Sequence, residues 1–197
     1  MTDEKESDVS REDDDGGNAD SSKGFSLWTK EKEGEEHNIY LHPYIGSVKN
    51  YLKLINMLDT ASEKDVFTIN ISGPGGSADT GLKLLNHLKT TDALVRMIVD
   101  SNVSSMSTIL AFGGNSLTIR GNVVFMWHVG SIGFFGDVKI SDLASAMRSE
   151  EESYKRLLQT YCSRVLSKKE INSIMTGTDI YLTGEEVTYR LQMSKKK

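Results

Sequence analysis

The chain has 197 residues, of which 38% are hydrophobic and 26% charged, and this suffices for one globular domain with a sizeable core. Its net charge of -5 gives no general attraction to nucleic acid or to an anionic membrane surface. No run approaches the about 20 apolar residues of a membrane span, and the acidic N-terminus lacks the apolar stretch of a secretory signal. We therefore expect a cytoplasmic protein that binds neither nucleic acid nor membranes, with the single Cys162 as an apolar filler.

Two tails flank the predicted domain. Residues 1–24 are rich in acidic residues, serine and glycine, and they contain too few apolar side chains to offset the entropy of ordering. This segment is therefore predicted to be a disordered acidic tail. Residues 194–197 end in three lysines and are expected to be a solvated basic end. Residues 25–193 are expected to form one domain.

Strands and helices alternate along the predicted domain. Runs of β-branched and apolar residues predict the strands, and apolar residues at a spacing of three or four predict the helices. This alternation predicts an α/β domain with a mainly parallel sheet, in which active groups gather on turns beyond the carboxyl ends of the strands. The expected strands are 38–42, 66–71, 94–99, 117–119 and 123–127, and the expected helices are 49–58, one capped by Ser77, 106–112 and 138–165.

Two of these helices carry more specific expectations. The helix after Ser77 contains Gly81, which is small enough to allow close packing of helix on strand. The long helix at 138–165 has an apolar stripe that is interrupted by Glu150 and Glu151. The middle of this helix is therefore expected to be solvated or to face a partner.

Two turns at predicted strand ends carry the groups that an acyl-transfer site needs. The expected strand at 66–71 breaks into Gly73-Pro74-Gly75-Gly76, where backbone N–H groups can approach a substrate without an intervening side chain. The expected strand at 94–99 runs into Ser104-Ser105, and Ser105 begins a helix whose first N–H groups have no partner within the helix. A serine nucleophile also needs a base to remove its proton and donors that stabilise charge on the substrate carbonyl.

His128 is the favoured candidate for that base. Of the four histidines, His37 lies in a polar stretch, His42 precedes a proline and His87 falls on a helix. Only His128 directly follows a strongly apolar strand on the same side of the predicted sheet as the serine turn.

Asp179 is the candidate to orient the base, because it precedes an apolar segment at 180–182 that should hold it in place.

Each element taken singly has an ordinary structural explanation. A glycine pair is commonly just a turn, Ser105 a helix cap, His128 a satisfied core residue and Asp179 a cap or loop residue. The order and the separations together predict a serine peptidase.

Several segments resemble the proteolytic subunit of the Clp protease family, which has a crotonase-like fold. The resemblance extends from about 38 to 193 and implies repeated β-β-α units, a mainly parallel sheet and a long handle helix through which two rings stack. The segments that carry it are 69–76, Gly81, 104–106, 124–128 and 179–187.

By position, the resemblance implies a catalytic triad. Ser105 would be the nucleophile, His128 the general base and Asp179 the acid that orients the base. The amides of the oxyanion hole would come from Gly76 and Met106.

The resemblance also implies binding partners. Substrate would lie as an extended strand beside Gly75, Gly76 and Gly130. The assembly would be a homo-oligomer of heptameric rings that encloses unfolded polypeptide delivered by an ATP-driven unfoldase of the AAA+ class. No metal or cofactor is expected.

The chain departs from the family pattern at three places. Ser-Asn-Val-Ser at 101–104 stands where the family has Gly-Gln-Ala-Ala, and Val129-Gly130 stands where it has Gln-Pro. Thr178 replaces the arginine that couples ring contacts to the triad.

Other functions compete with a Clp-type peptidase. An inactive or weakly active ring subunit would assemble with an active paralogue, and a phage capsid-maturation peptidase of similar fold would work without an unfoldase. A crotonase-type enzyme would act on acyl-coenzyme A, yet no basic pocket for the coenzyme phosphates is evident. Relatives of signal-peptide peptidase pair a serine with a lysine, and His128 argues against that class.

Overall fold

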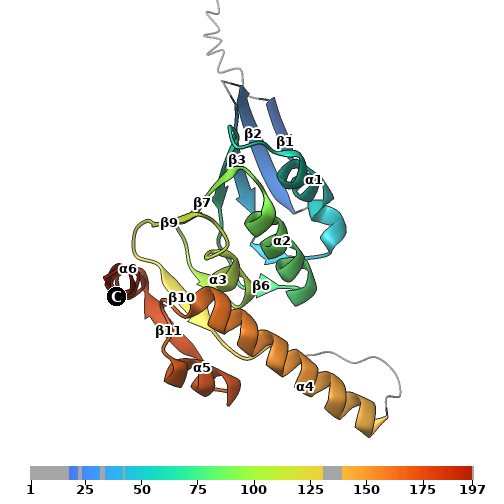
Figure 1. Cartoon of the computed structure of the whole chain (residues 1–197), viewed down its shortest axis with the longest axis vertical. Helices are drawn as coiled ribbons and strands as arrows, with labels where there is room; N and C mark the ends of the chain where they lie inside the picture. The colour runs from blue at the N-terminus through green and yellow to red at the C-terminus, as the bar shows by residue number, and fades with distance from the viewer. Residues whose placement is uncertain (1–17, 22–23, 32–33, 42, 131–138, 197) are drawn as a thin grey trace, which may run out of the picture.

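A six-stranded sheet is the centre of the fold in the computed structural model, which describes residues 18–21, 24–31, 34–41, 43–130 and 139–196. The last four strands pair in parallel and the first two add antiparallel strands at one edge, so the predicted α/β fold with a mainly parallel sheet is confirmed (Figure 1). In spatial order the strands are β1 (Asn18–Ser21), β2 (Phe25–Glu31), β3 (Glu35–Leu41), β5 (Val66–Asn70), β7 (Leu94–Val99) and β9 (Ser116–Ile119).

Two smaller sheets hold the segments with predicted catalytic residues. In the first, β10 (Val124–Trp127) is the middle strand, with β8 (Val103–Ser104) parallel on one side and β11 (Ile180–Thr183) antiparallel on the other. In the second, β4 (Tyr44–Ile45) pairs in parallel with β6 (Gly75–Gly76).

Three helices pack in succession beside the sheets: α1 (Leu52–Thr60), which follows the 3-10 turn η1 (Val48–Tyr51), then α2 (Ala78–Thr90) and α3 (Met106–Leu110). Leu84, Leu85 and Leu88 form the buried face of α2. Val95, Met97 and Val99 of β7 are fully buried and belong to the same hydrophobic core as this face of α2.

Gly81 allows α2 to approach α3 rather than a strand. A Cβ atom at Gly81 would collide with the side chain of Met106, which is buried. The prediction of close packing was correct for α2, but the expected partner was wrong. This contact fixes the first residue of α3, next to Ser105.

A long helix, α4 (Ile140–Leu157), projects from the rest of the molecule (Figure 1). It continues into a π-helical turn, η2 (Leu158–Cys162), so the prediction of one helix reaching residue 165 was wrong at its C-terminal end. Residues 145–152 are all exposed, as expected for a middle segment that is solvated or faces a partner. None of the helices in the described ranges is both long and apolar enough to cross a membrane.

Two further helices, α5 (Lys168–Met175) and α6 (Gly184–Ser194), were not among the predicted elements. Each begins with a capping box, in which the first side chain accepts a hydrogen bond from a backbone N–H and a glutamate accepts one in return. The pairs are Ser167 with Glu170 and Thr183 with Glu186.

The central sheet begins inside the segment that was predicted to be a tail. Asn18–Ser21 forms β1 and pairs along β2, in which Phe25 and Leu27 are buried and Trp28 is exposed. Residues 1–17 and Lys197 lie outside the described residues. Lys195 and Lys196, which follow α6, are exposed.

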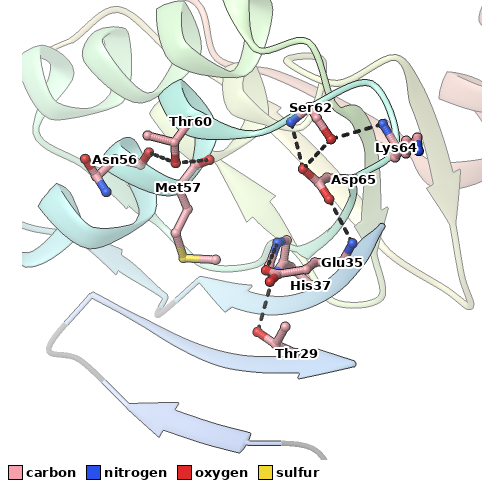
Figure 2. Close-up of polar contacts among 9 residues, drawn as sticks. All are labelled: Thr29, Glu35, His37, Asn56, Met57, Thr60, Ser62, Lys64 and Asp65. Carbon is pink, nitrogen blue, oxygen red and sulfur yellow. Dashed lines mark hydrogen bonds and ion pairs between the residues drawn. The ribbon is translucent and has the colours of Figure 1, made fainter. Parts of the chain in front are cut away.

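A polar cluster ties β3 to the turn between α1 and β5 (Figure 2). The carboxylate of Asp65 accepts hydrogen bonds from the Ser62 N–H at 2.7 Å and from the Glu35 N–H at 2.8 Å. These hydrogen bonds lower the pKa of Asp65. The cluster joins two segments that are far apart in the sequence.

His37 lies beside this cluster and is a core residue, although its sequence neighbours are polar. It is 5% exposed, its Nδ1 lies 3.1 Å from Thr29 Oγ1, and its ring packs against Phe67. Burial lowers the pKa of His37, and the charges of Glu35 and Asp65 oppose this effect in part. His37 is therefore a structural histidine that favours the neutral form.

Replacing His37 by glutamine should remove part of the pH dependence of stability. Because burial lowers the folded-state pKa of His37 below 6.5, the unfolded chain takes up a proton that the folded protein resists. The contribution of His37 to the free energy of unfolding is therefore fully present above about pH 6.5, and it is lost as the pH falls through the pKa of His37 in the folded protein. Urea unfolding at pH values between about 5 and 8 measures it. Equal pH slopes for the wild type and His37→Gln would contradict this account.

Candidate active site

Ser105 and His128 follow the ends of two neighbouring parallel strands. Ser104, the last residue of β8, pairs with Met126 of β10. Since β8 and β10 run in the same direction, Ser105 and His128 both come after the carboxyl end of their strand. The register thus brings these two predicted residues to one edge of the small sheet.

Asp179 comes to the same edge from the opposite direction. Ile180, the first residue of β11, pairs with Trp127, the last residue of β10, in an antiparallel ladder. Asp179 precedes Ile180 and His128 follows Trp127, so both lie just beyond the same rung. Segments far apart in the chain therefore meet at this edge.

Ser105 has a backbone conformation that side-chain-bearing residues rarely adopt. Its φ of 56° and ψ of -128° make it the one non-glycine residue with positive φ among those the structure describes. Such a conformation costs about 1–3 kcal/mol and persists only where the surroundings enforce it. Here the Ser105 N–H donates to the Met126 carbonyl at 2.9 Å, and the Ser105 carbonyl accepts from the Thr108 N–H at 3.1 Å.

The hydroxyl of Ser105 is not used to cap the helix. Ser105 occupies the N-cap position of α3, yet its side chain makes no capping hydrogen bond. The cap explanation that the sequence left open therefore does not apply. A partly exposed serine on a strained strand-to-helix turn has the geometry in which a nucleophile is presented to substrate.

The glycine-rich turn packs directly against the serine turn. The Gly73 carbonyl accepts a hydrogen bond from the Ser104 N–H at 2.9 Å. At Gly75, whose φ is 94°, a Cβ would lie 2.9 Å from both the Met106 nitrogen and the Ser105 Cβ. Only glycine fits this position without displacing the serine turn.

The two predicted oxyanion-hole residues adjoin this contact, because Gly76 follows Gly75 and Met106 follows Ser105. Gly76, with a φ of 145°, pairs with Ile45 in the β4–β6 ladder and leaves no room for a Cβ beside the Ile45 carbonyl. Met106 is the first residue of α3, so its N–H has no acceptor within the helix. The sequence-based placement of Gly76 and Met106 is thus compatible with the local packing.

Tyr154 of α4 positions the segment that contains His128. Its hydroxyl donates a 2.7 Å hydrogen bond to the His128 carbonyl oxygen. Burial raises the pKa of Tyr154, so the hydroxyl stays protonated and remains a donor. The apolar stripe of this helix gave no signal for a backbone partner of Tyr154 so distant along the chain.

Two of the other histidines have structural partners elsewhere. His37 lies buried in the sheet, and His87 Nδ1 forms a hydrogen bond with the carboxylate of Asp59. His42 lies outside the described residues. His128 is the described histidine that lies next to the serine turn.

In the described part of the chain, no hydrogen bond joins the side chains of Ser105, His128 and Asp179. Asp179 is exposed and His128 is half-buried. Catalytic hydrogen bonds are often long in a free enzyme and tighten when substrate binds. Gly130 is exposed, with open space around the position of a Cβ, so backbone can approach it.

Cys162 has the properties of a filler and not of a reactive thiol. It is fully buried, and burial raises the pKa of its thiol to about 12. Within the described ranges, no group of three histidine, cysteine or acidic side chains is arranged to hold a metal ion.

The family model of the Clp protease matches residues 33–190, which include every predicted catalytic residue. The chain belongs to the Clp protease family. A comparison with curated proteins finds no matching sequence. Membership confirms the predicted family and fold, and it supports a peptidase of the Clp type as the general class of the protein.

This Clp protease family member closes the loop before Asp179 with backbone hydrogen bonds. Thr178, which stands where the family has an arginine, is exposed, and its N–H donates to the Ser173 carbonyl at 2.9 Å. Gly177 just before it has a φ of 92° and an N–H that donates to the Ile174 carbonyl. The loop is therefore held to the end of α5 without an arginine side chain.

Gly75→Ala should destabilise the protein more than Gly177→Ala. The two glycines have nearly the same positive φ, but a Cβ meets the serine turn at Gly75 and open space at Gly177. The strain of positive φ is common to both variants, so the difference reports the steric contact, which we expect to be about 1–3 kcal/mol. Denaturant unfolding measures both values, and equal losses would show that Gly75 does not press on the serine turn.

Proposed function

We propose that this Clp protease family member is a serine endopeptidase with Ser105, His128 and Asp179 as its catalytic triad. The observation that carries the proposal is the Ser105 hydroxyl, which does not cap α3 and sits on a strained turn at the end of β8. Strain of this kind is costly and concentrates at functional sites. The register of β8, β10 and β11 supports the choice of partners.

The proposed reaction follows the general scheme of serine peptidases. Ser105 Oγ attacks the scissile carbonyl carbon while the His128 imidazole takes its proton, and Asp179 holds the imidazole in the required tautomer. The C–N bond then breaks, and His128 delivers the proton to the leaving amine. Water, deprotonated by His128, attacks the resulting ester, which releases the carboxylic acid and returns the proton to Ser105.

The developing negative charge on the carbonyl oxygen would be stabilised by backbone amides. In the proposal these are the N–H groups of Gly76 and Met106, which flank the contact of Gly75 with the serine turn. Each such donor contributes roughly 3 to 4 kcal/mol to transition-state stabilisation.

Unfolded polypeptide is the proposed substrate. An extended strand would lie beside Gly75 and Gly76 on one side and Gly130 on the other, because glycine permits close backbone approach. Only an unfolded segment presents the continuous backbone hydrogen-bonding groups that this mode of binding requires.

We infer further that the chain assembles into heptameric rings in the cytoplasm and receives substrate from an AAA+ unfoldase. The projection of α4 supports this assembly, because the exposed face of this long helix at Ser145, Arg148 and Ser149 suits contacts between rings (Figure 1). In this arrangement, the triad faces an enclosed chamber.

An inactive or weakly active ring subunit is the second candidate. Two observations favour it: no hydrogen bond joins the three side chains in the described part of the chain, and Thr178 replaces the family arginine. Such a subunit would assemble normally but would not react with a mechanism-based probe.

A fluorophosphonate probe should label the wild-type protein at Ser105, because only an activated serine reacts readily with it. Ser105→Ala should abolish labelling, whereas Ser104→Ala, one residue earlier on β8, should retain it. His128→Ala should slow the reaction by about 10²–10⁴-fold, since the general base is lost. Mass spectrometry of the labelled peptide at successive reaction times measures labelling in the wild type and in the three variants. Labelling that survives Ser105→Ala would overturn the assignment, and no labelling of the wild type would favour the inactive subunit.

The purified protein should form oligomers at micromolar concentration. Light scattering should give a mass several times that of the 21.9 kDa chain, because the exposed face of α4 at Ser145, Arg148 and Ser149 gains its partner only in an assembly. A mass of one chain would contradict the ring assembly while leaving the triad open to the labelling test.

A further inference from the structure

A pocket of about 260 Å³ is lined by residues that lie close in the sequence to the proposed catalytic groups. Its walls come from the segments that carry the proposed catalytic groups. Ala78 lies shortly after Gly76, Val129 and Gly130 follow His128, and Met175 ends the helix before Asp179. A side chain in this pocket would therefore belong to a substrate residue next to the attacked bond.

One face of α4 completes the pocket. Met147, Glu150, Glu151 and Tyr154 all line it, and their spacing of three and four residues places them on one side of the helix. The hydrogen bond from Tyr154 to the His128 carbonyl fixes this face against the segment that follows β10. The glutamates that interrupt the apolar stripe in the sequence are thus part of a pocket wall.

The two carboxylates have no cation of their own. Among the described residues, neither Glu150 nor Glu151 forms an ion pair, although Lys155 lies one turn further along α4. Two adjacent carboxylates at a pocket wall create a negative potential that favours a positively charged occupant.

The rest of the wall is apolar and adaptable. Met147, Met175 and Val129 offer apolar contact, and methionine side chains adjust to irregular shapes. The volume lies below the about 300–1,000 Å³ of pockets for drug-sized ligands, which suits a single side chain. Lysine and arginine combine a long apolar stem with a charged end and so match both parts of this wall.

We propose that this pocket binds the side chain of the residue whose carbonyl is attacked, and that Glu150 and Glu151 select lysine or arginine there. The inference rests on the proposed peptidase function. It makes the protein an endopeptidase that cleaves after basic residues. An apolar side chain would fill the same space but would leave both carboxylates without a partner.

Paired fluorogenic peptides test the preference. They carry arginine or citrulline before the scissile bond, because citrulline matches arginine in shape but lacks its charge. The wild type should hydrolyse the arginine peptide with a kcat/KM at least about tenfold higher, and the ratio should decrease with added salt because both glutamates are exposed. The double variant Glu150→Gln and Glu151→Gln should bring the ratio close to one. Glu152→Gln, a neighbouring exposed glutamate outside the pocket, should leave the ratio unchanged.

Binding of the same peptides to Ser105→Ala separates this inference from the proposed function. Fluorescence anisotropy should show tighter binding of the arginine peptide, and the double glutamine change should remove the difference. If the arginine peptide binds preferentially but the wild type cleaves neither peptide, the peptidase proposal fails and the pocket assignment stands. If the wild type cleaves both peptides equally well, or the ratio survives the double change, the pocket assignment fails and the peptidase proposal stands.

Discussion

The carbonyl oxygen of Met126 is the anchor of the candidate active site. It accepts the Ser105 N–H at 2.9 Å and the Thr108 hydroxyl at 2.9 Å, and so ties the serine turn and the first turn of α3 to β10. Without these hydrogen bonds, Ser105 could relax from its positive φ and recover about 1–3 kcal/mol. The direction of the Ser105 hydroxyl, and its position relative to the residue that follows β10, therefore depend on one acceptor in the middle strand of the small sheet.

Close packing reinforces this anchor from the opposite side. The buried side chain of Met106 fills the space that Gly81 leaves on α2. Gly75 lies so close to the Met106 nitrogen and to Ser105 that a Cβ there would collide with them. Because neither glycine can carry a Cβ there without displacing its neighbours, the serine turn is enclosed between a helix and a glycine-rich turn. Rigid support of this kind is what a preorganised nucleophile and its amide donors require.

Local patterns in the sequence predicted the elements whose residues alternate or repeat regularly. Runs of apolar and β-branched residues predicted β5, β7 and β10, whereas the short strands β8 and β11, which complete the small sheet, were not predicted. The capping boxes at Ser167 and Thr183 are also local signals, but α5 and α6 were missing from the predicted elements. Long-range contacts were not predictable in this way: the partner of Gly81, the hydrogen bond of Tyr154 and the pocket wall at Glu150 join residues that only the folded chain brings together.

A structure of the assembled protein with a peptide boronate tests the central claim most directly, because boron forms a tetrahedral adduct with an activated serine. The account predicts a covalent bond from boron to Ser105 Oγ, with one boronate oxygen about 3 Å from the amide nitrogens of Gly76 and Met106. His128 should then lie within hydrogen-bonding distance of the adduct and of Asp179. A boronate that leaves Ser105 unmodified, or an adduct whose oxygens point away from both amides, would contradict the account.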